Sequence, residues 1–141
     1  MTPDRTAFAL AHTGHIAATQ IRKTLALYGL KPGHGYTLLL LADHGALSQQ
    51  SLAGTLEVDP TVLVGLLNDL ERDGLTERQR DPADRRRHIV QITESGKSRA
   101  AEIEVAIADL EAALFADLNR DEISTFNSLL ARVMGGQSCE E

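Results

Sequence analysis

The sequence contains little of what membrane, secreted and disulfide-stabilised proteins require. Tryptophan is absent, aromatic residues make up 4% of the 141 residues, and the single cysteine is Cys139. No stretch approaches the roughly 18 consecutive apolar residues that a membrane-spanning helix needs. The N-terminal segment Met1-Thr2-Pro3-Asp4-Arg5 lacks the basic region and apolar run of a signal peptide. A lone cysteine cannot form an internal disulfide, so we expect a reducing, cytoplasmic setting.

The recurring sequence signatures of catalysis are also missing. The chain has no Ser, His and Asp grouping typical of a nucleophile with its base, no glycine-rich phosphate loop, and no paired carboxylates in a catalytic context. We therefore expect that the protein is not an enzyme and uses no cofactor.

The apolar residues that are present favour a mostly helical protein. They are chiefly Leu, Ala, Ile and Val, a mixture that suits helices packed around a core. A chain of 141 residues is long enough to bury such a core, and one domain is the default expectation.

The charge is distributed unevenly along the chain. The net charge is -6, but residues 72–99 contain eight basic and five acidic side chains, which leaves this stretch at +3 and the rest at -9. Such asymmetry would repel most of the molecule from phosphate and let one segment approach it. A solvated charged loop explains the same composition equally well.

Four segments in the first half of the chain have helical periodicity and recognisable ends. Thr2-Pro3, Ser48 and Asp59 are N-cap signals for the first, third and fourth of these helices. Gly33 and Gly35 are poor helix formers, and they predict a loose start for the second. The expected helices span residues 4–28, 34–43, 49–56 and 60–73.

The apolar period then changes from helical to alternating. Residues 75–80 and 88–92 are predicted strands, and residues 81–87 form the polar tip between them. Thr93 caps the next helix, whose apolar residues repeat every 3.5 positions, as in a helix-packing seam or an ordinary amphipathic helix. The seam consists of Ala100, Ile103, Ile107, Leu110 and Leu114.

The last predicted helix spans residues 120–134. Asn119 and Glu122 have the spacing of a capping box at its start. Gly135-Gly136 is expected to stop it, so that residues 135–141 form a frayed tail.

The order of a helix, a tight turn, a capped helix and a basic hairpin has a direct physical purpose. A helix fits the major groove of duplex DNA, and its N-terminal residues, here Thr61, Val62 and Gly65, meet the base edges. The preceding helix can direct its N-terminal amides at a phosphate, near Ser48, Gln49 and Gln50. Because the base-reading positions hold no Arg or Asn, we expect specificity to depend partly on DNA shape and on the hairpin.

Two stretches of the sequence resemble the MarR (multiple antibiotic resistance regulator) family. Residues 52–75, which end in Leu67-Asn68-Asp69-Leu70-Glu71-Arg72-Asp73-Gly74-Leu75, are similar to its two DNA-binding helices. Asp81-Pro82-Ala83-Asp84-Arg85-Arg86 and Ile92-Thr93-Glu94-Ser95-Gly96 are similar to its wing and the start of its long helix. The match is continuous over about residues 32–97.

The resemblance implies a homodimer that binds a pseudo-palindromic operator, with half-sites roughly 10 bp apart. In such proteins a wing arginine enters the minor groove and an aspartate two residues earlier helps to hold it. The matching residues are Arg86 and Asp84. The other cations expected near the DNA backbone are Arg78, Arg80, Arg85 and Arg87, although a solvated turn remains an alternative for residues 85–87.

The resemblance also implies a domain organisation. It predicts one MarR-type domain over residues 1–141, mostly α with a small β-hairpin. The winged helix-turn-helix lobe would occupy residues 32–97, and residues 4–30 and 98–134 would form the dimerisation helices. The implied function is a sequence-specific transcriptional regulator, expected to be a repressor that a small molecule releases from DNA.

Many members of the family bind a small aromatic or phenolic effector between the DNA-binding lobes and the dimerisation helices. The residues here that would line such a pocket, or would alternatively be ordinary core or interface residues, are His12, His15, Ile16, Tyr36 and His44.

Two alternatives concern sensing and one concerns the partner. His12 and His15 are one helical turn apart, a spacing compatible with metal ligation, but the sequence offers them no further ligand and we expect no metal site. Cys139 would be the residue of a redox-responsive regulator. The third alternative is a winged-helix module that binds a partner protein through its acidic faces.

Overall fold

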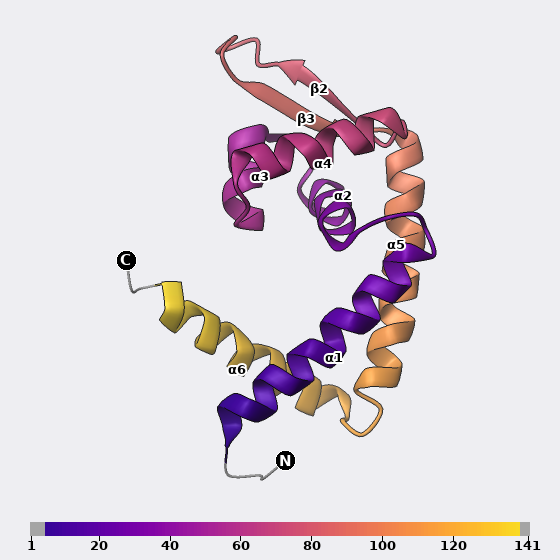
Figure 1. The fold of residues 1–141 in the computed structure, drawn as a ribbon, viewed down its shortest axis with the longest axis vertical. Helices are drawn as coiled ribbons and strands as arrows, with labels where there is room; N and C mark the ends of the chain where they lie inside the picture. The colour runs from indigo at the N-terminus through magenta and orange to yellow at the C-terminus, as the bar shows by residue number, and fades with distance from the viewer. Residues whose placement is uncertain (1–4, 139–141) are drawn as a thin grey trace.

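The computed structural model describes residues 5–138, which form six helices and three short strands (Figure 1). The elements in chain order are α1 (Thr6–Ala26), α2 (Pro32–His44), β1 (Leu47–Ser48), α3 (Gln49–Leu56), α4 (Pro60–Arg72), β2 (Thr76–Arg80), β3 (His88–Ile92), α5 (Glu94–Leu114) and α6 (Arg120–Ser138). The mostly helical fold with a small β-hairpin is the one that the sequence predicts.

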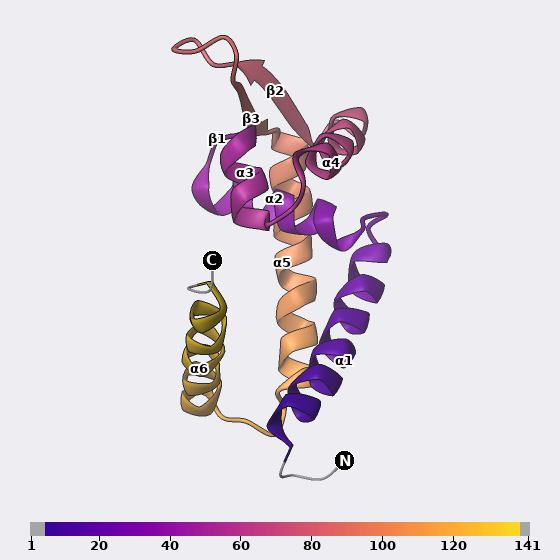
Figure 2. The same ribbon diagram turned by 60° about the vertical axis from the view of Figure 1, so that its left-hand side comes forward.

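The elements form two parts joined by α5. Helices α2 to α4 and the sheet, residues 32–92, make a compact lobe at one end of α5, and we call this part the lobe (Figures 1 and 2). Helices α1, α5 and α6 form the helical arm, in which α1 packs along α5. The hairpin of β2, β3 and residues 81–87, which we call the wing, projects from the far end of the lobe.

The lobe has a continuous leucine-rich core. The apolar faces of α2, α3 and α4 meet there, and β3 adds Val90 from the sheet. Each such side chain contributes about 1.5–3 kcal/mol when it is fully buried. The apolar residues of the lobe that solvent does not reach at all are Leu38, Leu52, Leu63, Leu67, Leu70 and Val90.

The sheet has the strand order β1-β3-β2 and is antiparallel throughout. Thr76 lies opposite Ile92 and Arg80 opposite His88, so the wing strands are fully paired. The sequence analysis missed β1, in which Leu47 pairs with Val90. Two residues are too short to show the alternating pattern by which a strand is recognised.

The predicted helix caps beyond residue 5 are confirmed. The Ser48 hydroxyl accepts the Ser51 amide at 3.0 Å, Asp59 accepts the Thr61 amide at 2.8 Å, and Thr93 accepts the Gly96 amide at 3.0 Å. Asn119 and Glu122 form the reciprocal capping box of α6, with bonds of 2.8 and 2.9 Å. The expected Thr2-Pro3 cap lies outside the described residues.

The start of α2 corrects one expectation. The helix begins at Pro32, before the predicted His34, and it is held rather than loose. His34 Nδ1 accepts the Lys31 amide at 3.1 Å. A Cβ on Gly33 would lie 3.0 Å from the Leu66 side chain, and one on Gly35 would lie 2.9 Å from Leu25. The two glycines therefore allow close packing at this point.

The end of α6 corrects another expectation. The helix continues through Gly135 and Gly136 to Ser138, whereas the sequence predicts an end at Met134 and a tail from residue 135. Glycine disfavours a helix by only about 1 kcal/mol. It stops a helix at a left-handed position, and the glycines with positive φ are Gly29, Gly45 and Gly74.

No helix within residues 5–138 is long and apolar enough to cross a lipid bilayer.

Candidate nucleic-acid interface

The Ser48 side chain stabilises the N-terminal end of α3. Besides capping the helix, the Ser48 hydroxyl donates to Ser51 Oγ at 2.9 Å and is buried. Gln49 is half-buried, and Gln50 is exposed. Of the three residues predicted near a phosphate, Gln50 therefore offers its side chain most directly.

The outward face of α4 carries the predicted base-reading residues. Leu63, Leu67 and Leu70 point into the core, and this orientation leaves Thr61, Val62 and Gly65 exposed. Val62 keeps 54% of its surface accessible and so presents an apolar side chain to solvent on this face of α4. Gly65 carries no side chain, and a Cβ placed on it would have no atom within 4 Å. The first two turns of α4 thus present a small, smooth surface to solvent.

The tip of the wing holds the predicted Asp84 and Arg86 pair. Asp84 Oδ1 accepts the Arg86 amide at 3.1 Å and its Nε at 3.3 Å. The Arg86 side chain is 92% exposed in spite of this contact. The carboxylate therefore restrains the arginine without covering it, and its role at DNA stays a prediction.

The turn between the wing strands is closed by its own hydrogen bonds. The Asp81 amide donates to the Arg87 carbonyl at 2.9 Å, and the Arg87 amide donates to the Asp84 carbonyl at 2.9 Å. Arg80 Nη1 donates to the Arg85 carbonyl at 3.0 Å. Arg85 and Arg87 themselves are exposed, so the turn displays its cations outward.

Arg78 lies differently from the other wing cations. The sequence predicts that it touches the DNA backbone, but its guanidinium is half-buried against α4. Nε donates to Glu71 Oε1 at 2.6 Å, and Nη2 donates to Glu71 Oε2 at 3.0 Å. The structure therefore directs this cation toward the lobe.

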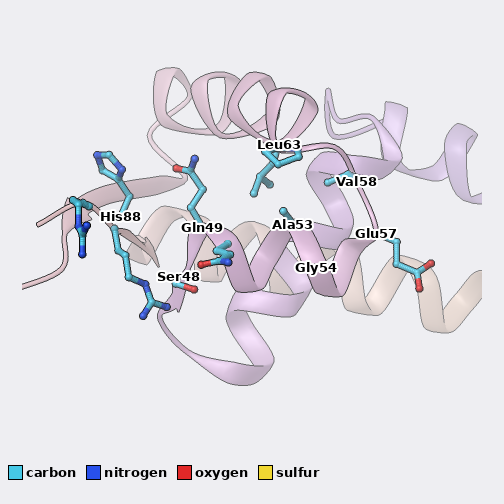
Figure 3. Close-up of a pocket in the computed structure, with 12 residues that line it drawn as sticks. Ser48, Gln49, Ala53, Gly54, Glu57, Val58, Leu63 and His88 are labelled. Carbon is cyan, nitrogen blue, oxygen red and sulfur yellow. The ribbon is translucent and has the colours of Figure 1, made fainter. Parts of the chain in front are cut away.

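A cleft of about 620 Å³ separates α3 and the start of α4 from the wing (Figure 3). His88 lies at one end of the cleft and Glu57 at the opposite end. The wing residues Arg86 and Arg87 also line it. The sequence analysis missed His88, although its place directly after three arginines is a signal that could have found it. The cleft joins the predicted phosphate-binding end of α3 to the wing cations.

A second residue that the sequence analysis missed is the buried His34. Because its Nδ1 accepts the Lys31 amide, its Nε2 carries the proton and donates to Asp69 Oδ2 at 3.0 Å. This hydrogen bond is the main cause that lowers the pKa of the Asp69 carboxyl below its usual value, and the nearby Arg72 acts in the same direction. The pair ties α2 to α4.

The predicted effector residues line neither of two cavities found within residues 5–138. His12, His15, Ile16, Tyr36 and His44 are all exposed. They line neither the cleft beside α3 nor an apolar cavity of about 360 Å³ between α1, the end of α5 and α6. That second cavity is lined by Thr6, Ala9, Leu10, Thr13, Gly14, Ala17, Leu114, Phe115, Phe126 and Leu130.

Metal ligands are not gathered anywhere in the described part of the chain. Within residues 5–138 no three His, Cys, Asp or Glu side chains are placed to hold one ion. The potential redox residue Cys139 lies outside those residues.

Comparisons with known proteins match both the sequence and the fold. A model of the MarR family matches residues 30–88. The putative transcriptional regulatory protein for the hcr operon of Thauera aromatica is 35% identical over 122 residues, which are 85% of this chain and 74% of that protein. A crystal structure of MarR superposes with a TM-score of 0.83 at 26% identity, covering 98% of this chain and 95% of that one.

A third comparison extends the likeness of the fold. The structure of Bordetella bronchiseptica BpsR, described by its regulation of DNA binding by 6-hydroxynicotinic acid, superposes with a TM-score of 0.83. It covers 95% of this chain and 96% of its own at 22% sequence identity.

Proposed function

The chain belongs to the MarR family of transcriptional regulators, and from this premise we propose that it binds an operator in duplex DNA as a homodimer. In the dimer, α4 of each copy enters a major groove and each wing reaches the adjacent minor groove. The pseudo-palindromic operator would place its half-sites roughly one helical turn apart. Bound across a promoter, the dimer would act as a repressor.

The observation that carries this proposal is the exposed Arg86 at the tip of the wing. Its side chain extends into solvent while Asp84 restrains its direction. A restrained cation loses less freedom on binding than a mobile one, and a narrow minor groove attracts arginine. Thr61 and Val62 lie exposed on α4 of the same lobe. Arg86 could therefore enter the minor groove while Thr61 and Val62 contact base edges in the major groove.

The exposed apolar side chains of the helical arm support the homodimer. Phe8 and Leu10 on α1 and Leu129 and Val133 on α6 are each about half or more exposed. A second copy of the chain would cover these helices and fix the separation of the two lobes. We place the dimer interface here.

We further propose that a small molecule releases the dimer from DNA by changing the separation of the two lobes. An effector that binds better to a dimer with displaced lobes shifts the population away from the DNA-binding state. BpsR, which shares the fold, is a protein whose DNA binding is regulated by 6-hydroxynicotinic acid. For this chain we propose an effector of the small aromatic class, and the residues proposed to line its site remain His12, His15, Ile16, Tyr36 and His44.

The test is selection of bound duplexes from a random pool, followed by titration of the selected duplex with Arg86→Ala. Loss of the groove contact should weaken binding by about 1–3 kcal/mol. Arg22→Ala removes an exposed cation from α1, far from the wing, and should leave the affinity unchanged. If the wild-type protein selects no duplex even at low salt, the proposed function is wrong.

A further inference from the structure

Arg78 connects the wing to the recognition helix α4. It lies in the middle of β2, opposite Val90 of β3. Its Nη2 donates both to Glu71 Oε2 at 3.0 Å and to Asn68 Oδ1 at 2.5 Å, and its Nε donates to Glu71 Oε1 at 2.6 Å. Asn68 and Glu71 are three residues apart and so lie one turn apart on the same face of α4. One side chain thus binds two turns of the helix.

The surroundings of this pair make it stronger than an ordinary surface ion pair. The Arg78 side chain is 22% exposed and that of Glu71 is 28% exposed. A two-pronged contact between guanidinium and carboxylate fixes both position and orientation. If Arg78 turned toward a phosphate, it would leave the Glu71 carboxylate unpaired and close to the negative DNA. That cost opposes a direct role for Arg78 at the DNA backbone.

The same strand face continues the connection toward the wing tip. Arg80 follows Arg78 by two residues and therefore points to the same side of β2. Its guanidinium donates to the Arg85 carbonyl, next to Arg86. The carbonyl of Arg85, directly before Arg86, is thus bound by a side chain of the same strand that Arg78 joins to α4.

We propose that Arg78 is a positioning residue: its ion pair with Glu71 sets the wing against α4 so that both reach DNA in one register. The proposal rests on the proposed function, in which α4 and the wing bind the same operator. The residue contributes by holding Arg86 and the base-reading face of α4 at a fixed separation, and no phosphate contact of its own is involved.

Glu71→Gln separates this role from a phosphate contact because the two roles predict opposite signs. If Arg78 binds phosphate, the substitution frees the arginine and removes a negative charge near DNA, so affinity rises. If Arg78 positions the wing, affinity for the selected duplex falls about tenfold, the size expected for one charge-assisted contact. Binding to a scrambled duplex of equal composition should stay equal or become slightly tighter, because non-specific binding depends on charge rather than on register.

Glu77→Gln is the matched control. Glu77 precedes Arg78 on β2 and is exposed, and no ion pair of its side chain is seen within residues 5–138. The charge change is identical, so binding should stay equal to the wild type or become slightly tighter. If Glu71→Gln loses affinity and Glu77→Gln does not, the loss is due to the broken Arg78–Glu71 ion pair and not to the removal of a negative charge.

Arg78→Lys provides the second variant. Lysine keeps the positive charge but cannot make the two-pronged contact. A third variant, Arg78→Gln, removes the charge as well. If Arg78 positions the wing, Arg78→Lys and Arg78→Gln should lose equal affinity, and the salt slope of binding should stay unchanged in both. A phosphate contact predicts that Lys nearly restores binding and that Gln lowers the slope by about one. Urea unfolding of each variant shows whether the lobe is still folded.

The binding results distinguish failure to bind DNA at all from failure of Arg78 to position the wing. Failure of the wild type to bind any duplex removes the proposed function and this inference with it. Wild-type binding that Glu71→Gln leaves unchanged or tightens overturns the positioning role alone. Wild-type binding that Glu71→Gln weakens for the selected duplex only, at a constant salt slope, supports it.

Discussion

The lobe and the helical arm differ in how much of their apolar surface one chain can bury. In the lobe, Leu52, Leu63 and Leu67 are inaccessible to solvent. In the arm, α1 has one buried residue, Leu25, and within residues 120–136 of α6 no side chain is buried. The lobe therefore buries its apolar side chains within one chain, whereas the exposed side chains of α1 and α6 would be covered by the second copy of the proposed homodimer.

A matched pair of leucines gives the largest expected contrast between the two parts. Leu67→Ala should lower the free energy of unfolding by about 3–4 kcal/mol, because it leaves a cavity in a fully packed core. Leu129→Ala on α6 removes a side chain that is 48% exposed in one chain. It should change lobe unfolding by less than about 1 kcal/mol and weaken dimerisation instead.

Urea unfolding and sedimentation measure these two effects separately. If Leu129→Ala destabilises the lobe as much as Leu67→Ala does, the lobe and the arm do not differ in how they are stabilised. If both variants leave the dimer dissociation constant unchanged, Leu129 is not part of the dimer interface.

The junction of the two parts is tested by a pair of glycines. A Cβ on Gly96, in the first turn of α5, would collide with the Leu75 carbonyl and lie 2.6 Å from the Ile92 side chain. Gly96→Ala should therefore cost about 1–3 kcal/mol through overpacking where α5 leaves the sheet. At Gly54 nothing lies within 4 Å of the added methyl.

Gly54→Ala is the control, and it should stabilise α3 by about 0.5–1 kcal/mol. The Tm of Gly96→Ala should thus fall below that of the wild type, and the Tm of Gly54→Ala should rise above it. Equal shifts of the same sign would mean that the junction tolerates a side chain and that the close approach of α5 to the sheet is not needed.

Two helix caps sharpen the contrast on a smaller scale. Ser48→Ala removes the cap of α3 in the lobe, and Asn119→Ala removes half of the capping box of α6. Each should cost about 1 kcal/mol locally. The Ser48 variant should lower the global stability of the lobe, because α3 belongs to its core.

The Asn119 variant should appear mainly as faster amide hydrogen exchange in α6. Since no side chain within residues 120–136 of α6 is buried in one chain, fraying of its first turn can occur without unfolding of the lobe. Protection of α6 equal to that of the wild type would show that a cap is unimportant once the dimer has formed.

The sequence predicted the parts of this molecule that local chemistry determines. The caps at Ser48, Asp59 and Thr93 depend on residues within three positions of each other, and so does the pairing of Asp84 with Arg86. Period and capping therefore placed α3, α4 and β3 with their observed starts. The outward position of Thr61 and Val62 follows from the same period.

What the sequence did not reveal depends on contacts between distant segments. His34 and Asp69 are 35 positions apart, and Gly35 fits against Leu25 only because α1 and α2 pack closely. The sequence predicts that Arg78 touches the DNA backbone, because it is basic and lies in the wing, and it does not reveal the contact with Glu71. Its partner Glu71 is on another element, and no periodicity links a strand residue to one face of a helix.

The smallest expected effect concerns the polar contact between α2 and α4 and its response to acid. The pKa of Asp69 is lowered chiefly by the hydrogen bond from His34, with Arg72 and Lys31 adding positive charge nearby. A carboxyl whose pKa is lower in the folded than in the unfolded chain stabilises the fold above its unfolded pKa, and this contribution is lost as the pH falls through the folded pKa. The loss should therefore begin below about pH 4, the usual range of an aspartate.

Asp69→Asn removes this dependence and keeps an oxygen that can accept from His34. The urea midpoints of wild type and variant should differ by a constant amount above about pH 5 and converge in acid. The side chain is 39% exposed, so we expect the difference to be smaller than that of any substitution above. Curves that stay parallel down to about pH 2.5 would mean that the link between α2 and α4 does not depend on the Asp69 charge. The link would then depend on the hydrogen bond from His34 alone.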